Sequence, residues 1–577
     1  MTERDDDFRI RPGRVRNNDA RSFIGQVERA ARRMTQGGRG PGGRRPGGSR
    51  FGRGRSAALS ATLRSPSRRV IVKARVVRHR GVRFRAAPLS RHIDYLGREG
   101  VTRDGAGART FDAGSDAADK HAFAERCEDD RHHFRFIVSP EDAGEMADLR
   151  AFTRDLMADA ERDLGTRLDW VAVDHWNTDN PHIHVLVRGR ADDGRDLVIN
   201  PDYIRRGLRG RAEALVSLEL GPRSEREIGA ALAREVAAER WTGLDVALQI
   251  ASDEGGGIVD LRPGGTEHDS ELRRLLVGRA TRLEHLGLAE QVGPARWMLK
   301  PGMEQTLRDL SIRGDIIKTM HRAMTEAGRE PDVSGFAMHS DTPSDPVLGR
   351  LVARGLDDEL KGSAYAIVEG IDGRTHHLRF PDLELTGDAR PGAIVEARAY
   401  QDGGGRQRLS LAIRSDLPIG AQIAVQGATW LDRQLLARDP PIGGSGFGAE
   451  VRQAMDRRVD HLTDEGLARR QGQRIAFARD LLNTLRRREL DDAVAKLSTE
   501  TGLAHHPSAE GDHVVGAYRQ RVTLASGRFA MIDDGLGFQL VPWRPALEQR
   551  LGQHVSGIMM PGGGVEWSIG RNRGLGI

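Results

Sequence analysis

Three histidines lie close together in one short segment of the chain, and their spacing is that of a metal site. His175 is followed by His182 and His184, so the imidazoles occur at offsets of 0, 7 and 9. Neutral imidazoles bind zinc, manganese, nickel or iron, and three of them leave coordination positions open, as in catalytic sites. A bare His-x-His pair also occurs by chance, so the third histidine carries the interpretation. The pattern predicts a bound divalent metal ion, which we take to be Mg, Mn or Zn.

A β-hairpin is the element that would bring these histidines together. Residues 170–173 and 185–187 are apolar and rich in β-branched side chains, and residues 177–181 form a polar turn between them. Side chains alternate between faces along a strand, so His182 and His184 point to the same side. His175 joins them if it pairs with His182, whereas a slip of one residue would send it to the opposite face.

A tyrosine in a strongly basic region is the candidate nucleophile. Tyr95 lies in residues 90–100, and no acidic residue occurs from Arg55 to Ile93. A half-buried core tyrosine is the simpler interpretation of Tyr95 alone, but the one-signed basic run leads directly to it and suits a phosphate backbone. Among the five tyrosines of the chain, Tyr203 is the other candidate in this part of the sequence.

The motifs in this region resemble those of a known family. Residues 95–100 read Tyr-Leu-x-Arg-x-Gly, and the histidine segment ends in Pro-His-x-His. Together they resemble the relaxases of conjugative and mobilisable plasmids, of the type that includes the T-DNA border endonuclease, within the His-hydrophobic-His single-strand nickases. Residues 200–209 and 220–223 also look like that family's catalytic domain. The resemblance covers about residues 65–225, and the remainder looks like the long C-terminal region of uncharacterised function in one relaxase subgroup.

The resemblance implies a site-specific and strand-specific DNA endonuclease that works by transesterification. Tyr95 would attack the scissile phosphate and give a 5′-phosphotyrosine intermediate and a free 3′-hydroxyl, and a metal on the three histidines would act as Lewis acid and template. Because tyrosine has an ordinary pKa of about 10, a base or a positive field must help it to ionise. The candidates for a base, or for a residue that orients a histidine, are Asp94, Asp174 and Asp179.

Charge and composition agree with a nucleic-acid partner. The net charge is +6, but residues 11–55 contain thirteen arginines against Asp19 and Glu28, which implies a polyanion. We expect single-stranded DNA at the nick site and adjacent duplex as partners, and the resemblance adds accessory transfer-origin proteins and a secretion coupling protein. The arginines expected to contact DNA are Arg68, Arg69, Arg75, Arg78, Arg91, Arg98, Arg273, Arg274 and Arg279.

The lone cysteine and the hydropathy pattern indicate a compartment. Cys127 cannot form an internal disulfide, which suits a reducing environment. No apolar run approaches eighteen residues, and the first residues have no signal-peptide pattern. We therefore expect a cytoplasmic protein without a membrane span.

The chain should form several domains of an α+β fold. The catalytic domain should have a central antiparallel sheet with helices on one face: strands at residues 70–77 and 133–138, then a helix that begins after Ser139 and runs to about Leu164. Helical and small β-rich domains should follow it. The helix at residues 270–286 and the hairpin at 287–299 suggest a winged helix, although an ordinary amphipathic helix beside a hairpin fits equally. The expected domains are 1–55, a disordered Arg/Gly-rich tail with one short helix; 56–225, catalytic; 226–340, helical and possibly winged-helix; 341–440, a small β-barrel; 441–505, a charged helical segment; and 506–577, β-rich.

Two other functions fit the same residues. A rolling-circle replication initiator would use the same tyrosine and metal, and relaxation of a supercoiled transfer-origin plasmid without replication would distinguish a relaxase from it. A non-catalytic DNA-binding protein would use the histidines to hold a structural metal. That protein should lose its fold on chelation and should be unaffected by Tyr95→Phe.

Overall fold

A computed structural model gives the fold of the 577-residue chain. The predicted tail up to Gly54 and the predicted site residues Arg91, Asp94, Tyr95, Arg98 and Asp179 lie outside the described residues. The chain divides into two compact units, one formed by the residues before Arg68 with Gly221–Ile312, the other by Arg68–Leu220 with Arg313–Ile577. The described residues are 55–79, 89, 92–93, 96–97, 102–104, 107–176, 180–263, 270–339, 342–358, 360–437, 441–472 and 474–568.

A four-stranded antiparallel sheet holds the three histidines. Its order is β1-β2-β4-β3, so the histidine hairpin β3–β4 lies beside β2, and β1 forms the far edge. The expected α+β fold with an antiparallel sheet is confirmed. The strands are β1 (Val70–Arg78), β2 (His132–Pro140), β3 (Trp170–His175) and β4 (His182–Arg188).

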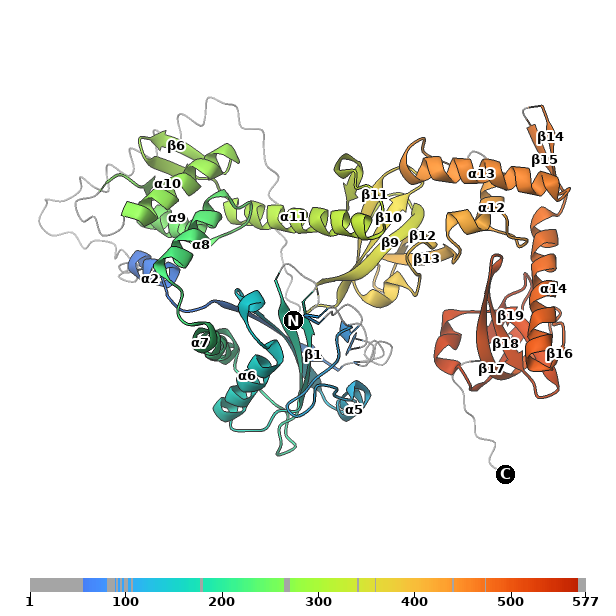
Figure 1. The fold of residues 1–577 in the computed structure, drawn as a ribbon, viewed down its shortest axis with the longest axis horizontal. Helices are drawn as coiled ribbons and strands as arrows, with labels where there is room; N and C mark the ends of the chain where they lie inside the picture. Colours follow the sequence, from blue (N-terminus) through green and yellow to red (C-terminus); the bar gives the residue numbers. More distant parts are fainter. Residues whose placement is uncertain are drawn as a thin grey trace, which may run out of the picture. The chain divides into compact units, whose positions relative to one another are not determined.

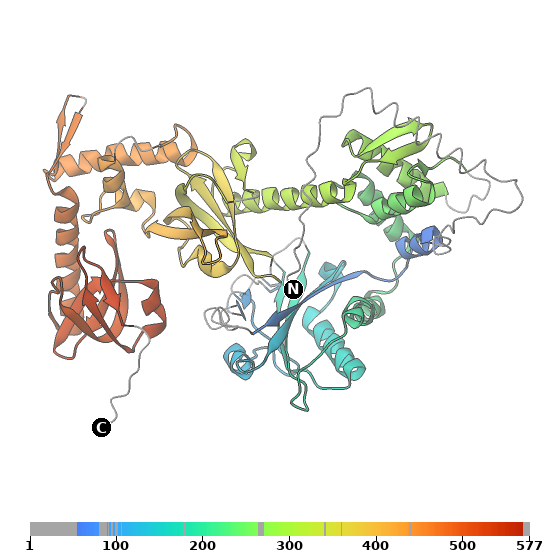
Figure 2. The same ribbon diagram turned by 180° about the vertical axis from the view of Figure 1, so that it is seen from behind.

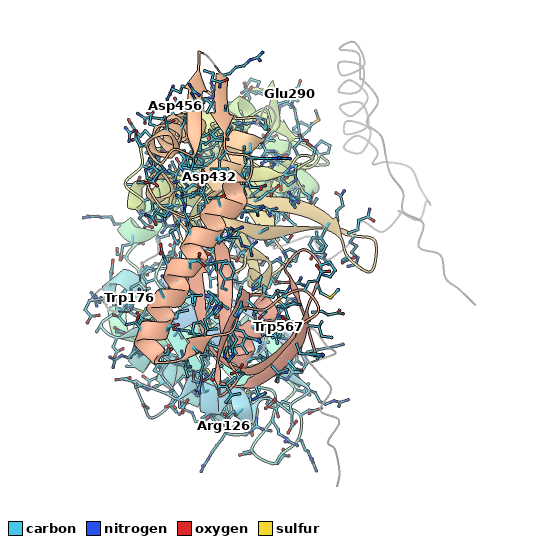
Figure 3. The ribbon with its side chains drawn as sticks, turned by 90° about the vertical axis from the view of Figure 1, so that its right-hand side faces the viewer. Arg126, Trp176, Glu290, Asp432, Asp456 and Trp567 are labelled. Carbon is cyan, nitrogen blue, oxygen red and sulfur yellow. The ribbon has the colours of Figure 1, made fainter. Side chains whose placement is uncertain are left out.

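Both faces of this sheet are covered. α6 (Leu149–Leu164) and α7 (Arg209–Leu220), preceded by the π-helix η2 (Tyr203–Leu208), bury one face. The other face also carries a helix, so the structure differs from the predicted sheet with helices on one face. α5 (Lys120–Arg126) packs on the other face, together with Leu89, Ile93 and Leu96. Figure 1 shows these layers, Figure 2 shows them from behind, and Figure 3 labels Arg126 at the end of α5.

The expected start of the first long helix is wrong. Ser139 and Pro140 continue β2, where they pair with Ile71 and Val70 at the end of the ladder. A 3-10 turn, η1 (Ala143–Glu145), follows, and α6 begins after Asp148, whose carboxylate accepts hydrogen bonds from the amides of Arg150 and Ala151. A Ser-Pro pair can end a strand as well as begin a helix, and here the sheet pairing decides.

The first unit is a helical module with a small sheet. α10 (Ser270–His285) and the hairpin β6 (Ala289–Gly293) and β7 (Arg296–Leu299) lie where the sequence predicts them, and β5 (Val259–Asp260) completes a sheet of order β5-β7-β6. The other helices of the unit are α2 (Arg55–Leu63), α8 (Glu225–Ala237), α9 (Gly243–Glu254) and the first part of α11 (Met303–Glu326).

The expected domain boundary at residue 56 is also wrong. Leu63 of α2 packs with Ile228, Leu232, Leu244 and Leu272 of this helical unit. Helix α2 therefore belongs to the helical unit, and the unit with the histidine sheet begins at Arg68. The apolar periodicity of a helix as short as α2 does not indicate which distant part of the chain it packs against.

A fully buried ion pair joins the helices of this unit. Arg279 of α10 and Asp245 of α9 have fully buried side chains, with Nε 2.7 Å from Oδ1 and Nη2 2.8 Å from Oδ2. Arg279 also donates to the carbonyls of Val236, Ala238 and Arg240. The expectation that Arg279 contacts DNA is therefore wrong, because its guanidinium is used inside the fold.

We expect Arg279→Ala to destabilise this unit strongly. The substitution leaves the Asp245 carboxylate buried without its partner, which costs about 3–5 kcal/mol. Arg308→Ala is the control, because Arg308 and Glu304 are exposed partners on α11 and such pairs contribute under about 1 kcal/mol. Hydrogen exchange at the amides of α9 and α10 reads the local free energy of opening. Equal protection in the two variants would contradict the prediction.

The remainder of the second unit contains two further sheets. One has the order β13-β12-β9-β10-β11-β8 and the other β16-β19-β18-β17-β20-β21. Helices and a short ribbon connect them. The elements are β8 (Phe336–Met338), β9 (Val347–Asp358), β10 (Ser363–Gly370), β11 (Thr375–Phe380), β12 (Ile394–Gln401), β13 (Gln407–Ser415), α12 (Trp430–Leu436), α13 (Gly446–Asp464), β14 (Ala468–Gln471), β15 (Arg474–Phe477), α14 (Leu481–Thr501), β16 (Ala504–His505), β17 (His513–Leu524), β18 (Gly527–Asp533), β19 (Gly537–Pro542), β20 (His554–Met559) and β21 (Val565–Trp567), with 3-10 turns η3 (Val333–Gly335), η4 (Leu383–Thr386), η5 (Ile419–Gln422) and η6 (Pro545–Arg550).

Strands dominate much of residues 341–440 and 506–577, the two regions predicted to be β-rich. The segment predicted to be helical at 441–505 is interrupted by the ribbon β14–β15. Within the part of the chain that the structure describes, no helix combines the length and the apolar character needed to cross a membrane.

Candidate metal centre

The register of the β3–β4 hairpin brings the three histidines to one face of the sheet. His175 pairs with His182, and Val173 pairs with His184. This is the register that the sequence required for a three-histidine site, and it is confirmed. Because paired residues of an antiparallel ladder point to the same side, all three imidazoles project from the face that also carries Val173 and Leu186.

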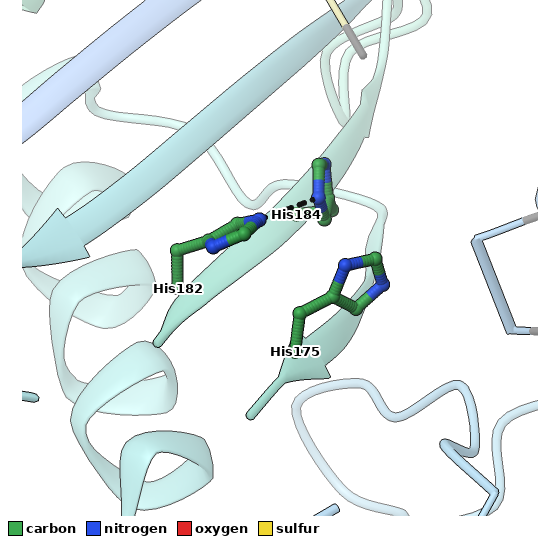
Figure 4. A group of neighbouring side chains, drawn as sticks. All are labelled: His175, His182 and His184. Carbon is green, nitrogen blue, oxygen red and sulfur yellow. Dashed lines mark hydrogen bonds between the residues drawn. The ribbon is translucent and has the colours of Figure 1, made fainter. Parts of the chain in front are cut away.

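The three rings converge within a small volume. One nitrogen from each ring can be chosen so that all three lie within 4.8 Å of one another. The ring centroids of His175 and His184 are 4.5 Å apart, and those of His182 and His184 are 5.0 Å apart. His175 and His184 are buried and His182 is half-buried, so solvent can reach the cluster from the His182 side. Figure 4 shows the three rings turned toward one another.

Backbone carbonyls orient two of the rings. His182 Nδ1 lies 2.9 Å from the carbonyl oxygen of Asn180, and His175 Nε2 lies 3.0 Å from that of Leu96. A carbonyl oxygen only accepts, so each of these nitrogens carries the proton. The lone pair is then on His182 Nε2 and on His175 Nδ1. Fixing the tautomer of a metal-binding histidine through its second nitrogen is the usual arrangement around a metal.

The spacing of the nitrogens fits a metal ion. His182 Nε2 and His184 Nε2 are 3.1 Å apart. Two imidazole nitrogens that bind one ion at about 2.1 Å, with an angle between 90° and the tetrahedral value, are separated by about 3.0–3.4 Å. The residues present therefore fit a divalent cation, and the donor set of three neutral imidazoles leaves coordination positions for a substrate oxygen or water.

Described residues on both sides of Tyr95 lie on the face of the sheet that carries the histidines. Ile93 and Leu96 are fully buried with Val173 and Leu186. The Leu96 carbonyl is the acceptor for His175, and Leu96 directly follows Tyr95 in the sequence.

Exposed cations of β1 share this face. Lys73 pairs with Ile137 of β2, which pairs in turn with His184. Arg75, predicted to bind DNA, follows on the same face, and both side chains are exposed. Arg78 is exposed at the end of the strand, and Arg69 is half-buried before its start.

Arg68 is placed differently from the prediction. Its side chain is only 6% exposed, and Nη1 lies 3.1 Å from Asp142 Oδ2. It also donates to the carbonyl of Leu220. The expectation that Arg68 contacts DNA is wrong, because the guanidinium links the start of β1 to the ends of neighbouring elements. On α10, Arg274 is exposed and Arg273 is half-buried.

Asp174 has neither of the two roles predicted for it. It precedes His175 on β3, so its side chain points to the opposite face. Its carboxylate accepts hydrogen bonds from Arg150 Nε and Nη2 and from Trp176 Nε1, at 2.9–3.1 Å. The expectation that Asp174 is a base or orients a histidine is therefore wrong, and its carboxylate instead ties the end of β3 to α6.

An open pocket lies around the ion pair of Asp174 and Arg150. Its volume is about 810 Å³, and its lining includes Trp176, the arginines Arg103, Arg109 and Arg150, and the aspartates Asp104, Asp148 and Asp174. The Arg103 guanidinium stacks over the Trp176 ring at 5.3 Å. Sequence reasoning missed this surface of arginine, aspartate and tryptophan side chains, and its signal in the sequence is the tryptophan that directly follows the first histidine.

Cys127 is excluded as a reactive group by its surroundings. The thiol is buried beneath α5, and burial raises its pKa to about 12. Asp130 and Asp169 act in the same direction. The thiol therefore stays protonated at neutral pH and supplies no thiolate.

Comparison with known proteins places the C-terminal half in a family. The model of a family described as a protein of unknown function (DUF3363) matches residues 276–406 and 397–576. No curated protein and no solved structure matches the chain. The two matched segments together span more than half of the 577 residues, and the histidine hairpin precedes them. The chain therefore belongs to the DUF3363 family.

Proposed function

We propose that the chain is a DNA relaxase that cuts one strand at a transfer origin and stays covalently attached to it until the ends are rejoined. The observation that carries the proposal is the convergence of three imidazole nitrogens on one sheet face, with His175 bonded to the carbonyl of the residue after Tyr95. A tyrosine beside a divalent metal site would supply the nucleophile and the Lewis acid that phosphodiester transesterification needs.

The reaction can be written for the residues of this chain. The phenol oxygen of Tyr95 loses its proton to solvent or a base and attacks the scissile phosphorus. The phosphorus–tyrosine oxygen bond forms as the bond to the 3′-oxygen breaks, and that oxygen takes up a proton. The products are a 5′-phosphotyrosine and a free 3′-hydroxyl, and the reverse reaction rejoins the strand. When bound, a metal on His175, His182 and His184 would withdraw charge from the non-bridging phosphate oxygens.

The chain's own residues would position the strand. Lys73 and Arg75 offer exposed positive charge on the histidine face, where a phosphate backbone could run. On the opposite face of the sheet, Arg103, Arg109 and Trp176 line the pocket together with Asp104, Asp148 and Asp174, and the guanidinium and indole groups there could contact the strand. The proposed partners are thus single-stranded DNA at the site and neighbouring duplex, with accessory transfer-origin proteins and a secretion coupling protein acting in the cytoplasm.

The test is capture of the covalent intermediate. The full chain is incubated with Mn²⁺ or Mg²⁺ and single-stranded DNA that spans the presumed transfer origin and is labelled on the 3′ side of the nick. We expect labelled DNA that stays with the 63.4 kDa chain through denaturation, and no such adduct when EDTA is added first. Absence of an adduct with a validated origin, together with melting of the sheet on chelation, would instead indicate a structural metal.

A further inference from the structure

The chain contains two copies of one helix–helix–ribbon module. The first runs through α9, α10, β6, β7 and the start of α11, and the second through α12, α13, β14, β15 and the start of α14. In each copy a long helix ends at a glycine, a short antiparallel hairpin follows, and another helix begins.

The buried ion pair is the same in both copies. Arg458 and Asp432 have fully buried side chains, with Nε 2.8 Å from Oδ1 and Nη2 2.9 Å from Oδ2. Figure 3 labels Asp432. Each aspartate also closes a capping box with the threonine three residues earlier, Thr242 in the first copy and Thr429 in the second.

The backbone around the ion pair repeats as well. Arg458 donates to the carbonyls of Ile423, Val425 and Gly427, just as Arg279 donates to three alternate carbonyls before its own aspartate. In both copies a side-chain oxygen nine residues upstream accepts from the amide preceding the aspartate: Glu235 for Leu244, and Gln422 for Leu431. A coincidence of so many buried contacts at matching positions indicates a duplicated module.

The junction between the long helix and the ribbon is also the same in the two copies. Gly287 and Gly466, each eight residues after the buried arginine, have φ of 72° and 71°. The next amide, of Leu288 or Leu467, donates back to the helix carbonyl of Leu283 or Leu462 at 2.8 Å. These contacts fix where each ribbon leaves its helix.

The two ribbons differ in the face they turn away from the core. In the first, Trp297 is buried and the exposed Glu290 lies on the other face. In the second, Ala468 and Phe477 face the core, so Arg469, Gln471 and Arg474 lie on the outward face, all exposed. Arg469 occupies the position of Glu290, counted from the junction glycine.

No carboxylate neutralises this outward face. Arg470, on the core-facing side, pairs with Asp460 of α13 at 2.5 Å. Among the described residues, no carboxylate forms an ion pair with Arg469 or Arg474. Helix α13 exposes Arg452 and Arg457 as well as Asp456 and Asp460, so its surface is of mixed charge. The outward face of the ribbon therefore carries positive charge that no described carboxylate neutralises, and Arg486, Arg487 and Arg488 are also exposed near the start of α14.

We infer that the second module binds duplex DNA through the outward face of the β14–β15 ribbon. A two-stranded ribbon fits a DNA groove, and arginine and glutamine suit phosphate oxygens and base edges. No described aromatic side chain lies on that face, so stacking on single-stranded bases would not be its mode of binding. The inference goes beyond the proposed nicking, because it needs neither the metal nor Tyr95.

The test is the salt dependence of binding to a duplex that lacks any transfer origin, measured by fluorescence anisotropy with the full chain in EDTA. We expect Arg469→Glu combined with Arg474→Glu to weaken binding at least about tenfold, and the slope of log K against log salt to fall by about 2. Arg469→Gln with Arg474→Gln removes the cations without adding carboxylates and should show a smaller change in the same direction.

Arg406→Glu is the matched control, because Arg406 is exposed in the turn between β12 and β13 and the charge change per residue is the same. Affinity and slope should stay at the wild-type values in this control. Wild-type affinity and slope in both ribbon variants would overturn the inference and favour a protein partner for the ribbon. EDTA and a duplex without an origin separate this result from failure of the proposed nicking, which only the adduct assay reads.

Discussion

Replacing Tyr95 by phenylalanine should abolish the covalent protein–DNA adduct, with a loss of at least about a thousandfold, as expected when a nucleophile is removed. The phenyl ring keeps the shape of the side chain and lacks only the oxygen that would attack phosphorus. The measurement is the denaturing-gel adduct with labelled single-stranded DNA and Mn²⁺. Noncovalent affinity for the same strand, measured in EDTA, should change little, because the substitution leaves the cationic surface intact.

Tyr203→Phe is the control for this experiment. Tyr203 lies on η2, beside the core on the α6 and α7 side of the sheet, away from the histidines. Its hydroxyl donates to Asp163 at 3.0 Å, and burial and then that carboxylate raise the pKa of Tyr203. It is therefore a poor nucleophile, and Tyr203→Phe should form the adduct normally. An adduct that persists in Tyr95→Phe and disappears in Tyr203→Phe would move the nucleophile to Tyr203.

The histidine hairpin could be predicted from the sequence because every signal for it is local. Two β-branched runs around a polar turn predict the strands, and side-chain alternation then gives the face of each histidine. The register required for a three-histidine site, His175 opposite His182, is the one observed. The signals for the helix at 270–285 and its hairpin are equally local, because apolar periodicity marks the helix and a Gly-Pro tip marks the hairpin.

Residues whose roles depend on distant partners could not be predicted in this way. Arg68 and Arg279 look like surface cations in the sequence, but Asp142 and Asp245, 74 and 34 residues away, bring them into the interior. Asp174 was assigned by its nearness to His175 in the sequence, although adjacent strand residues face opposite ways. The carbonyl of Leu96 carries no sequence signal at all, because every residue has one.

The duplicated module has a signature in the sequence from which it could be predicted. Arg279 and Arg458 are each followed, eight residues later, by Gly-Leu-Ala, and each aspartate follows its threonine by three. The separations between aspartate and arginine differ, 34 residues against 26, and this hides the repeat from a search at one fixed period. Matching the capping box and the glycine junction separately would have found it.

Replacing His184 by alanine should lower the affinity for Mn²⁺ or Zn²⁺ at least about a hundredfold and remove the metal-dependent adduct with it. The Nε2 of His184 is 3.1 Å from that of His182, so the substitution removes one of the three converging nitrogen ligands. Calorimetric titration of the metal and the gel assay give the two readouts. His121→Ala is the control, since His121 is an exposed histidine of α5 in the same unit. Metal affinity equal to wild type would contradict the assignment.

Thermal melting of the same proteins separates a catalytic ion from a structural one. A catalytic ion that binds a preformed site raises the melting temperature only by mass action, so wild-type protein in EDTA should keep its sheet and lose only the adduct. A structural ion would supply folding free energy, and chelation would then unfold the domain. The rings of His175 and His182 are already oriented by the carbonyls of Leu96 and Asn180, which do not depend on the ion. We therefore expect the EDTA-treated sheet to remain folded, and its unfolding would overturn the catalytic interpretation even if His184→Ala also lost the adduct.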